Sequence, residues 1–200
     1  MLTGCGGGSS NSGSISSSDT AVKNTVDSTS DETSNTMTNA DNEDATINTN
    51  ALTIDDSLMT CEDDLSDVLE LINQLRIQNQ TCGESSYPAV AEVTLNNTLI
   101  SAATEHSNNM ANYNFFSHTG LDGSTVGTRV TAQGYTWSRV SENIAGGLNS
   151  AQAVVDGWMS SEGHCANIMN AEVTEMGLAC QVNSDADYQY YWTQVFAKPR

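Results

Sequence analysis

Apolar residues recur every three or four positions in several segments after residue 60, and polar residues fill the positions between them. This spacing places one apolar stripe on each of several helices. The first helix is predicted to begin near Thr60, which offers a capping side chain. Three more are predicted: a long one after Asn97 or Thr98, a short one at 125–133, and one capped by Ser150. The inward residues of the first two are Leu65, Val68, Leu69, Ile72 and Leu75, and then Leu99, Ala102, Ala103, His106 and Met110.

The C-terminal part has a different pattern, because two segments rich in β-branched and aromatic residues flank a polar stretch. These segments are Met176 to Val182 and Tyr188 to Ala197, and residues 183–187 between them are typical of a turn. The pattern predicts a closing hairpin. Helices around a few strands favour an α+β sandwich with a single core of adequate size.

The first part of the chain shows neither pattern. No aromatic residue precedes Tyr87, although the chain holds three Trp, six Tyr and three Phe. Small polar residues dominate positions 6–51, and such a composition does not build a core. We therefore divide the chain into an acidic, Ser/Thr/Asn-rich tether at 1–58, disordered to about Ala51, and a folded domain at 59–200.

The charge of the chain excludes two classes of function. Six Lys and Arg stand against 25 Asp and Glu, which gives a formal net charge of -19. An anionic nucleic acid would be repelled. Lys23 and Lys198 are the only lysines, and neither ends a glycine-rich loop. The sequence therefore lacks the signature of nucleotide-dependent phosphoryl transfer.

The chain opens with a short motif that points to the cell envelope. No apolar run approaches the roughly 20 residues that cross a bilayer, but Met1-Leu2-Thr3-Gly4-Cys5 resembles the end of a bacterial lipoprotein signal peptide. In that pattern Cys5 is acylated, becomes the mature N-terminus and anchors the protein in a membrane. The basic and apolar parts of a signal peptide do not precede it, so either the true start lies upstream or Cys5 is an ordinary cysteine of the tail.

The other four cysteines favour an oxidising compartment. They are an even number in an acidic chain and form two close pairs in the sequence. The economical pairing joins Cys61 to Cys82 and Cys165 to Cys180, and each bridge would contribute about 3 kcal/mol. A four-thiolate zinc site is disfavoured, because the chain has no Cys-x-x-Cys. We expect a secreted or cell-envelope protein, an outer-membrane lipoprotein if Cys5 is acylated.

Several fragments together resemble a known family. In order along the chain they are Phe116-Ser117-His118, Asp122-Gly123, Arg129, Gly134-Tyr135, Glu142-Asn143-Ile144-Ala145, Trp158-Met159-x-Ser161, Gly163-His164-x-x-Asn167-Ile168 and Tyr191-Trp192-Thr193-Gln194-x-Phe196. They resemble the bacterial branch of the CAP superfamily, the cysteine-rich secretory, antigen 5 and pathogenesis-related proteins, whose domain is also called the SCP domain. The resemblance covers roughly 65–196.

The resemblance implies a three-layer α-β-α sandwich, export from the cell, and a central cleft that two His and two Glu line in animal and plant members. His118 matches the first family His, and Glu142 matches the Glu of the Glu-Asn pair. Ser161 and Tyr191 stand where those members have the other Glu and His. His164 belongs to a fragment typical of bacterial members. With Gln194, these residues are the candidates for the lining of the cleft.

Two interpretations of the cluster remain open. His118, Glu142 and His164 could supply three ligands to Zn²⁺ and leave one position for water, or they could hydrogen-bond loops to one another and brace the cleft. The chain lacks His-Glu-x-x-His, and the spacing of the three residues is not diagnostic. It also lacks Gly-x-Ser-x-Gly, so a serine hydrolase is disfavoured. We favour the brace, and expect His106 to be a buried, hydrogen-bonded histidine.

These observations favour a secreted or surface-tethered binding module over an enzyme. Some family members bind sterols or fatty acids, so the resemblance puts a lipid or sterol-like ligand first, ahead of other extracellular ligands. A metal-dependent hydrolase that uses His118, Glu142 and His164 is the first alternative. An adhesin-like interaction scaffold is the second. Fold alone does not choose among them, because one fold hosts many functions.

Overall fold

The computed structural model describes Leu2–Cys5 and residues 61–200. The predicted disorder up to Ala51, and the cap offered by Thr60, lie outside the described residues. Within the described part of the chain, no helix is long and apolar enough to span a membrane.

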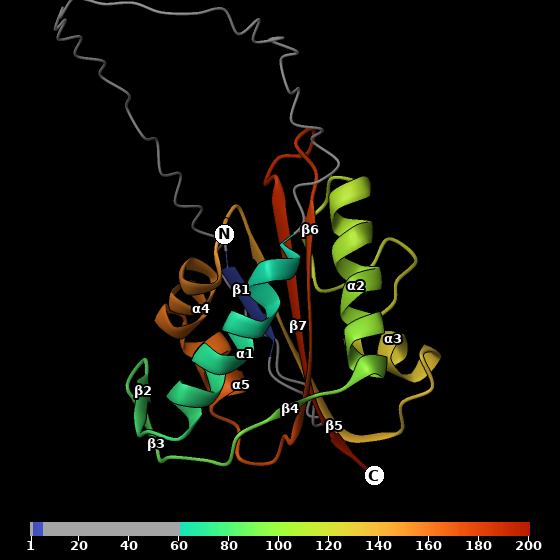
Figure 1. Cartoon of the computed structure of the whole chain (residues 1–200). Coiled ribbons are helices and arrows are strands. Elements are labelled where there is room, and N and C mark those ends of the chain that lie inside the picture. Colours follow the sequence, from blue (N-terminus) through green and yellow to red (C-terminus); the bar gives the residue numbers. More distant parts are fainter. Residues whose placement is uncertain (1, 6–60) are drawn as a thin grey trace, which may run out of the picture.

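The fold has three layers, with a five-stranded sheet between two sets of helices (Figure 1). The strand order is β1-β5-β7-β6-β4. One face of the sheet carries α1, α4 and α5, and the other carries α2 and α3. The helices are α1 Glu62–Arg76, α2 Asn97–Asn112, α3 Val126–Ala132, α4 Ala151–Ser160 and α5 Glu162–Ile168. The strands are β1 Leu2–Cys5, β4 Thr94–Leu95, β5 Trp137–Gly146, β6 Glu175–Val182 and β7 Tyr190–Pro199; the hairpin of β2 Gln80–Cys82 and β3 Ser85–Tyr87 lies apart. This arrangement confirms the α-β-α sandwich.

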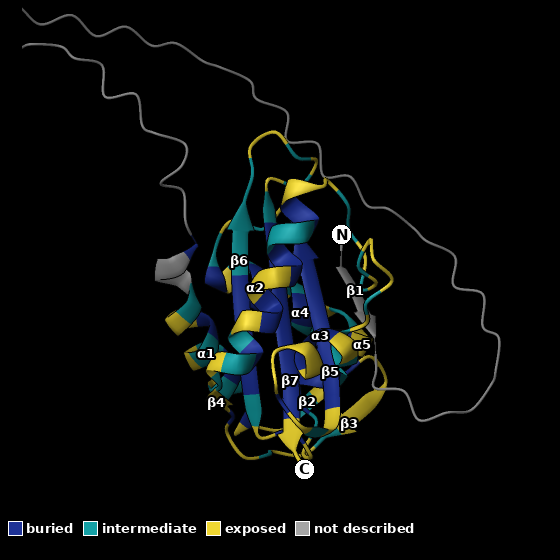
Figure 2. Cartoon of the chain, turned by 90° about the vertical axis from the view of Figure 1, so that its right-hand side faces the viewer, coloured by how far each residue is buried: buried dark blue, intermediate teal, exposed yellow. Residues whose placement is uncertain are grey.

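The predicted closing hairpin is the centre of the sheet. Strand β7 pairs antiparallel with β6 on one side and with β5 on the other. Both of its faces are buried (Figure 2). Because neighbouring side chains of a strand point to opposite faces, Trp192 and Phe196 pack beneath α1 and α4, whereas Val195 packs beneath α2.

The helices begin where the sequence offers capping side chains. Asn96 caps α2 by accepting hydrogen bonds from Thr98 N and Leu99 N, one residue before the predicted cap. Thr125 forms a capping box at α3, and Ser150 caps α4. Glycine allows the closest packing between the layers. A Cβ at Gly177 of β6 would overlap backbone atoms of Leu99, so this glycine lets the start of α2 lie directly on the sheet.

Several elements were not predicted, and most of them are short. The hairpin β2–β3, the strand β4 and the seven-residue helix α5 offer too few residues for an apolar period to be recognised. Strand β1 lies in the segment that we assigned to the tether. It pairs antiparallel with β5, with Leu2 opposite Ala145 and Cys5 opposite Glu142, and forms an edge of the sheet.

The predicted disulfide pairing is wrong, although all four cysteines are bridged. The bonds join Cys61 to Cys180 and Cys82 to Cys165. Cys61 and Cys82 lie beyond opposite ends of α1, a helix of 15 residues, and a helix of that length separates its ends by about 22 Å. A disulfide needs Cα atoms within about 7 Å. Cys61, at the start of α1, therefore pairs with Cys180 on β6, and Cys82 on β2 pairs with Cys165 on α5.

Candidate polar cluster beside strand β5

Four polar side chains from four different segments meet on the face of the sheet covered by α2 and α3. They come from α2, from the loop after it, from α3 and from β5, and we call them the Glu142 cluster: His106, His118, Arg129 and Glu142. Three of the four are buried, and the side chain of His118 is 22 % exposed. Glu142 therefore lies behind His118 and does not itself reach the surface.

The Glu142 carboxylate accepts two short hydrogen bonds. His118 Nδ1 donates to Oε1 at 2.8 Å, and Arg129 Nη2 donates to Oε2 at 2.6 Å. Hydrogen bonds that an ionised carboxylate accepts are among the strongest in proteins. Each carboxylate oxygen thus accepts a hydrogen bond from a different side chain. The negative charge of Glu142 and the positive charge of Arg129 compensate one another.

Arg129 also holds the loop that carries His118. Its Nη1 and Nη2 groups both donate to the backbone oxygen of His118, each at 3.2 Å, and Nη1 donates to the backbone oxygen of Ser124 at 3.1 Å. One guanidinium therefore joins the two ends of the segment 118–124 to the carboxylate on β5. This is the geometry of a brace for a loop.

His106 completes the cluster from α2. Its Nε2 lies 2.9 Å from the carbonyl oxygen of Ser117, which can only accept, so Nε2 carries the proton. The same nitrogen lies 4.0 Å from Glu142 Oε1. Burial is the main cause that lowers the pKa of His106 below its usual value, and the charge of Glu142 opposes this effect only in part. The expectation of a buried, hydrogen-bonded histidine is confirmed.

The pKa of Glu142 is lowered although the side chain is buried. Burial by itself would raise it, but the hydrogen bond from His118 and the positive charge of Arg129 together outweigh burial. The carboxylate is therefore ionised at neutral pH. A general acid needs the opposite shift, since it must hold its proton near neutrality.

The other predicted site residues do not join this cluster. Glu142 and Asn143 are neighbours on β5, so their side chains point to opposite faces of the sheet. Asn143 bonds to Gln194 Oε1 at 2.9 Å and to the backbone oxygen of His164 at 3.3 Å. His164 and Gln194 therefore belong to the layer of α5, with Asn167, whose amide donates to Asn143 Oδ1 at 2.8 Å.

Tyr191 and Ser161 also lie outside the Glu142 cluster. Tyr191 is fully buried in a small core with Met110 and Ile144, and its hydroxyl donates to Asn114 Oδ1 at 3.2 Å. Ser161 is the single residue between α4 and α5. Of the six candidates, His118 and Glu142 are joined by a hydrogen bond on one face of the sheet, and Gln194 and the backbone of His164 share the amide of Asn143 on the other.

The zinc alternative left open by the sequence, with His118, Glu142 and His164 as ligands, would need side chains from both faces of the sheet. The β5 backbone lies between the carboxylate of Glu142 and the layer of α5 that holds His164. Within the described residues, no group of three or more His, Cys, Asp or Glu side chains could hold a metal ion. Two of the three proposed ligands adjoin, and a tetrahedral zinc site with an open position needs three.

Sequence reasoning gave no role to Arg129 and only a structural one to His106. Arg129 is one of six basic residues in the chain and is nearly fully buried. A lone Arg between apolar positions of a short helix needs a buried partner, and this signal could have linked it to Glu142.

Comparisons with known proteins agree with this fold. The sequence profile of the cysteine-rich secretory protein family, CAP, matches residues 69–196. Two Bacillus subtilis proteins are similar: the membrane protein YlbC, 28% identical over 131 residues, and YkwD, 29% identical over 121 residues. These matches cover 66% and 60% of this chain but only 33% and 45% of the relatives, so the chain spans less than half of their length.

Solved structures show the same fold at low identity. An extracellular Bacillus anthracis protein with an SCP domain has a TM-score of 0.57 and 24% identity, over 70% of this chain and 41% of that one. An outer surface protein of Borrelia burgdorferi has a TM-score of 0.60 and 19% identity, over 70% of this chain and 95% of that one. The profile match spans well over half of the chain, and the protein belongs to the CAP family of cysteine-rich secretory proteins.

Proposed function

We propose that this protein is an exported, non-enzymatic binding module whose Glu142 cluster shapes a ligand-binding loop. The main support for the proposal is that the Glu142 carboxylate accepts one hydrogen bond from His118 and one from Arg129. A carboxylate held in this way stabilises the loop, because each of its oxygens accepts a hydrogen bond from a different element. The family membership supports an extracellular role.

The segment around His118 supports an apolar ligand. Tyr113 and Leu121, at the two ends of this segment, are 66 % and 68 % exposed, and Phe115 and Phe116 are half-buried between them. Two exposed large apolar side chains on the segment that also carries the partly exposed His118 would suit an amphipathic molecule. A lipid or sterol-like ligand would place its polar group near His118 and its apolar body on this segment.

Export is supported by the two disulfides, which persist in oxidising compartments. We propose that Cys5 is the acylation site of a tether. Maturation at Cys5 would remove Leu2, Thr3 and Gly4, so the pairing of β1 with β5 would exist only before that cleavage. Detergent partition of the exported protein tests the anchor, because Cys5→Ser should move it into the aqueous phase.

A binding assay tests the module. The full chain is titrated with a fluorescent fatty acid and with a fluorescent sterol, and ester hydrolysis is measured on the same samples. We expect saturable binding of one of the probes and no hydrolysis above that of buffer. Leu121→Asp should weaken binding at least about tenfold, because it places a charge on the apolar segment.

Two variants separate the module from an enzyme. Ala132→Asp adds a negative charge at an exposed position of α3 outside the apolar segment, so it is the charge control and should leave probe binding unchanged. Glu142→Gln should keep binding within about threefold at a temperature where the variant is folded. Hydrolysis by the wild type that disappears in folded Glu142→Gln would contradict the proposal.

A further inference from the structure

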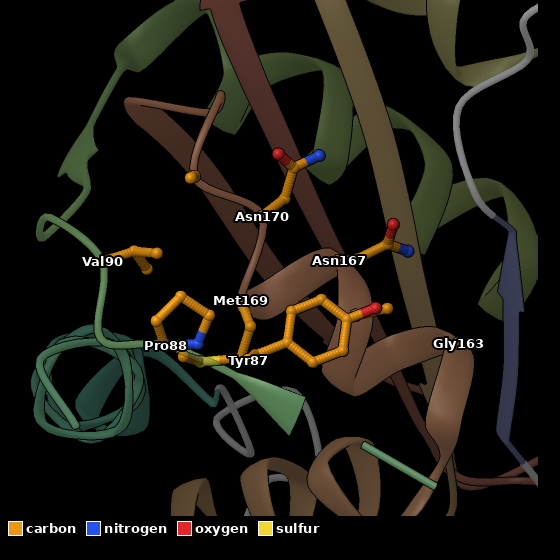
Figure 3. Close-up of a pocket in the computed structure, with 9 residues that line it drawn as sticks. Tyr87, Pro88, Val90, Gly163, Asn167, Met169 and Asn170 are labelled. Atoms are coloured by element: carbon orange, nitrogen blue, oxygen red, sulfur yellow. The ribbon is translucent and has the colours of Figure 1, made fainter. Parts of the chain in front are cut away.

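A pocket of about 460 Å³ lies on the opposite side of the sheet from the Glu142 cluster (Figure 3). It opens between the segment that follows β3 and the helix α5 with its following turn. Its volume lies within the roughly 300 to 1,000 Å³ typical of sites for small molecules. Tyr87, Pro88 and Val90 line one wall of the pocket, and Asn167, Met169 and Asn170 line the other.

Arg76 joins the two walls of this pocket. It is the last residue of α1 and is fully buried. Its Nε donates to the backbone oxygen of Ala91 at 2.8 Å, on the first wall. Its Nη groups donate to three backbone oxygens on the second wall, those of Ile168, Asn170 and Val173, at 2.5, 3.1 and 3.3 Å.

These bonds are unusual for a buried cation, because every partner is a neutral carbonyl. Burial lowers the pKa of Arg76 to about 10, which keeps the guanidinium charged at neutral pH. A buried charge is costly unless its hydrogen bonds are well satisfied. The hydrogen bonds of Arg76 hold the segment of Ala91 at a fixed distance from the segment of Ile168, although the two are more than 70 residues apart in the sequence.

Further links hold the first wall in place. The disulfide Cys82–Cys165 ties the β2–β3 hairpin directly to α5. Val90 N donates to the backbone oxygen of Arg76 at 2.7 Å. Ala89 N donates to Asn79 Oδ1 at 2.9 Å. The pocket is therefore built before any ligand arrives, and a preformed site avoids the entropic cost of ordering its walls.

The lining chemistry defines the class of ligand. None of the nine lining residues carries a charge at neutral pH, and the chain has a net charge of -19. Anions are repelled by this charge, and cations find no carboxylate in the lining. Tyr87, Pro88 and Met169 offer an apolar surface with one aromatic ring. Asn170 accepts a hydrogen bond from Glu172 N through Oδ1, which leaves its Nδ2 group as a donor for a ligand.

We propose that this pocket binds a neutral sugar ring of an extracellular glycan, with Tyr87 against the apolar face of the ring and Asn170 bonded to a hydroxyl group. A pyranose combines an apolar face with hydroxyl groups at its edge, and an aromatic ring beside a side-chain amide complements both. An acyl chain would form no hydrogen bond with the amide. The proposal concerns a different site from the apolar segment around His118 and does not depend on the ligand of that segment.

The test uses saturation-transfer NMR on the full chain. The probes are cellobiose and N,N′-diacetylchitobiose, and glucuronic acid serves as the charged control. We expect transfer to at least one neutral disaccharide with a Kd in the millimolar range, and none to glucuronic acid. Absence of transfer to both neutral probes, or stronger transfer to glucuronic acid, would overturn the proposal.

Matched tyrosine variants assign the binding to this pocket. Tyr87→Ala should weaken sugar binding at least about tenfold, whereas Tyr87→Phe should preserve it. Gln133→Ala removes an exposed side chain at the end of α3, on the other face of the sheet, and should have no effect. Equal losses in Tyr87→Ala and Gln133→Ala would show that the sugar binds elsewhere and would overturn the assignment.

Arg76 is a positioning residue in this proposal, and its test separates positioning from stability. Lys keeps the charge, but its single ammonium group cannot replace the planar fork that reaches both walls. We expect Arg76→Lys to weaken sugar binding about fivefold or more under conditions where near-UV circular dichroism shows a folded variant. Asn79→Ala, which removes only the bond to Ala89 N, is the milder variant should Arg76→Lys not fold. Wild-type affinity in the folded variant would overturn the positioning role.

Discussion

At the scale of single residues, the chain is defined by two buried arginines that perform different tasks. Arg129 compensates the charge of Glu142 and closes the loop that carries His118. Arg76 has only backbone carbonyls as partners and fixes one segment against another. Both act through planar, multiple donation, which Lys cannot reproduce.

The first prediction concerns the Glu142 carboxylate. Glu142→Ala leaves the buried charge of Arg129 without a partner and should lower the free energy of unfolding by about 3 to 5 kcal/mol. Glu142→Gln keeps the shape and one hydrogen bond, and should cost about 1 to 3 kcal/mol. Urea unfolding at neutral pH measures both values. Equal stability of Glu142→Ala and the wild type would show that the cluster is not a brace.

The second prediction concerns acid destabilisation through His106. Its pKa is lowered in the folded chain, so the unfolded chain binds a proton at higher pH than the folded chain does. The free energy of unfolding should therefore fall as pH drops below the usual His value of about 6.5, by about 1.4 kcal/mol for each unit by which the folded pKa is lowered.

Comparison with one variant isolates the contribution of His106. His106→Gln keeps a donor for the Ser117 carbonyl and does not titrate, so its stability should change less than that of the wild type between pH 7 and 5. Glu142 causes a second loss of stability at lower pH. Its pKa is also lowered in the folded chain, so its contribution to the free energy of unfolding is lost as pH falls through that pKa. Parallel stability curves for His106→Gln and the wild type between pH 7 and 5 would contradict this assignment.

Residue types could be predicted better than residue partners. His118 and Glu142 were paired correctly because both stand in recognisable fragments. His164 was grouped with them for the same reason, but a sequence fragment does not show which face of a sheet a side chain occupies. The face that a side chain occupies depends on the register of strand β5, because a shift of one residue would move every side chain of the strand to the opposite face.

At the scale of elements, local signals predicted the helices that are long or well capped. The apolar stripe of α1, the stripe of α2 and the caps at Thr125 and Ser150 were sufficient. The order of strands in the sheet and the contact of β2–β3 with α5 depend on long-range packing, which no local period encodes. The same limitation explains the wrong disulfide pairing.

The third prediction tests that pairing and its effect. Mapping of non-reduced peptides should give cross-linked fragments that join Cys61 to Cys180 and Cys82 to Cys165. The bonds span 119 and 83 positions of the sequence, and loops of that size stabilise a protein by about 4.5 to 5 kcal/mol in the chain-entropy description. Replacing either pair by Ser should therefore lower the free energy of unfolding by several kcal/mol, as urea titration would measure. A peptide that joins Cys61 to Cys82 would contradict the fold.

At the scale of the whole molecule, the two faces of the sheet have different chemistry. The face under α2 and α3 holds the charged Glu142 cluster, and the face under α4 and α5 holds an amide network around Asn143 and the uncharged pocket. The two networks include neighbouring residues of β5, Glu142 in the first and Asn143 in the second. Asn167 belongs to the pocket and donates to the backbone oxygen of Glu142 at 3.4 Å. A binding module with two separate sites on a rigid sheet is consistent with this division.

The most direct test of the central claim is native mass spectrometry of the full chain, purified without chelator and then supplied with an equimolar amount of zinc. If the Glu142 cluster is a structural brace, the wild type and Glu142→Gln should both have the mass of a chain with two disulfides, and neither should carry a stoichiometric metal ion. A retained organic ligand would add its mass in both proteins. One zinc ion per wild-type chain that is lost in folded Glu142→Gln would contradict the claim and identify the cluster as a metal centre.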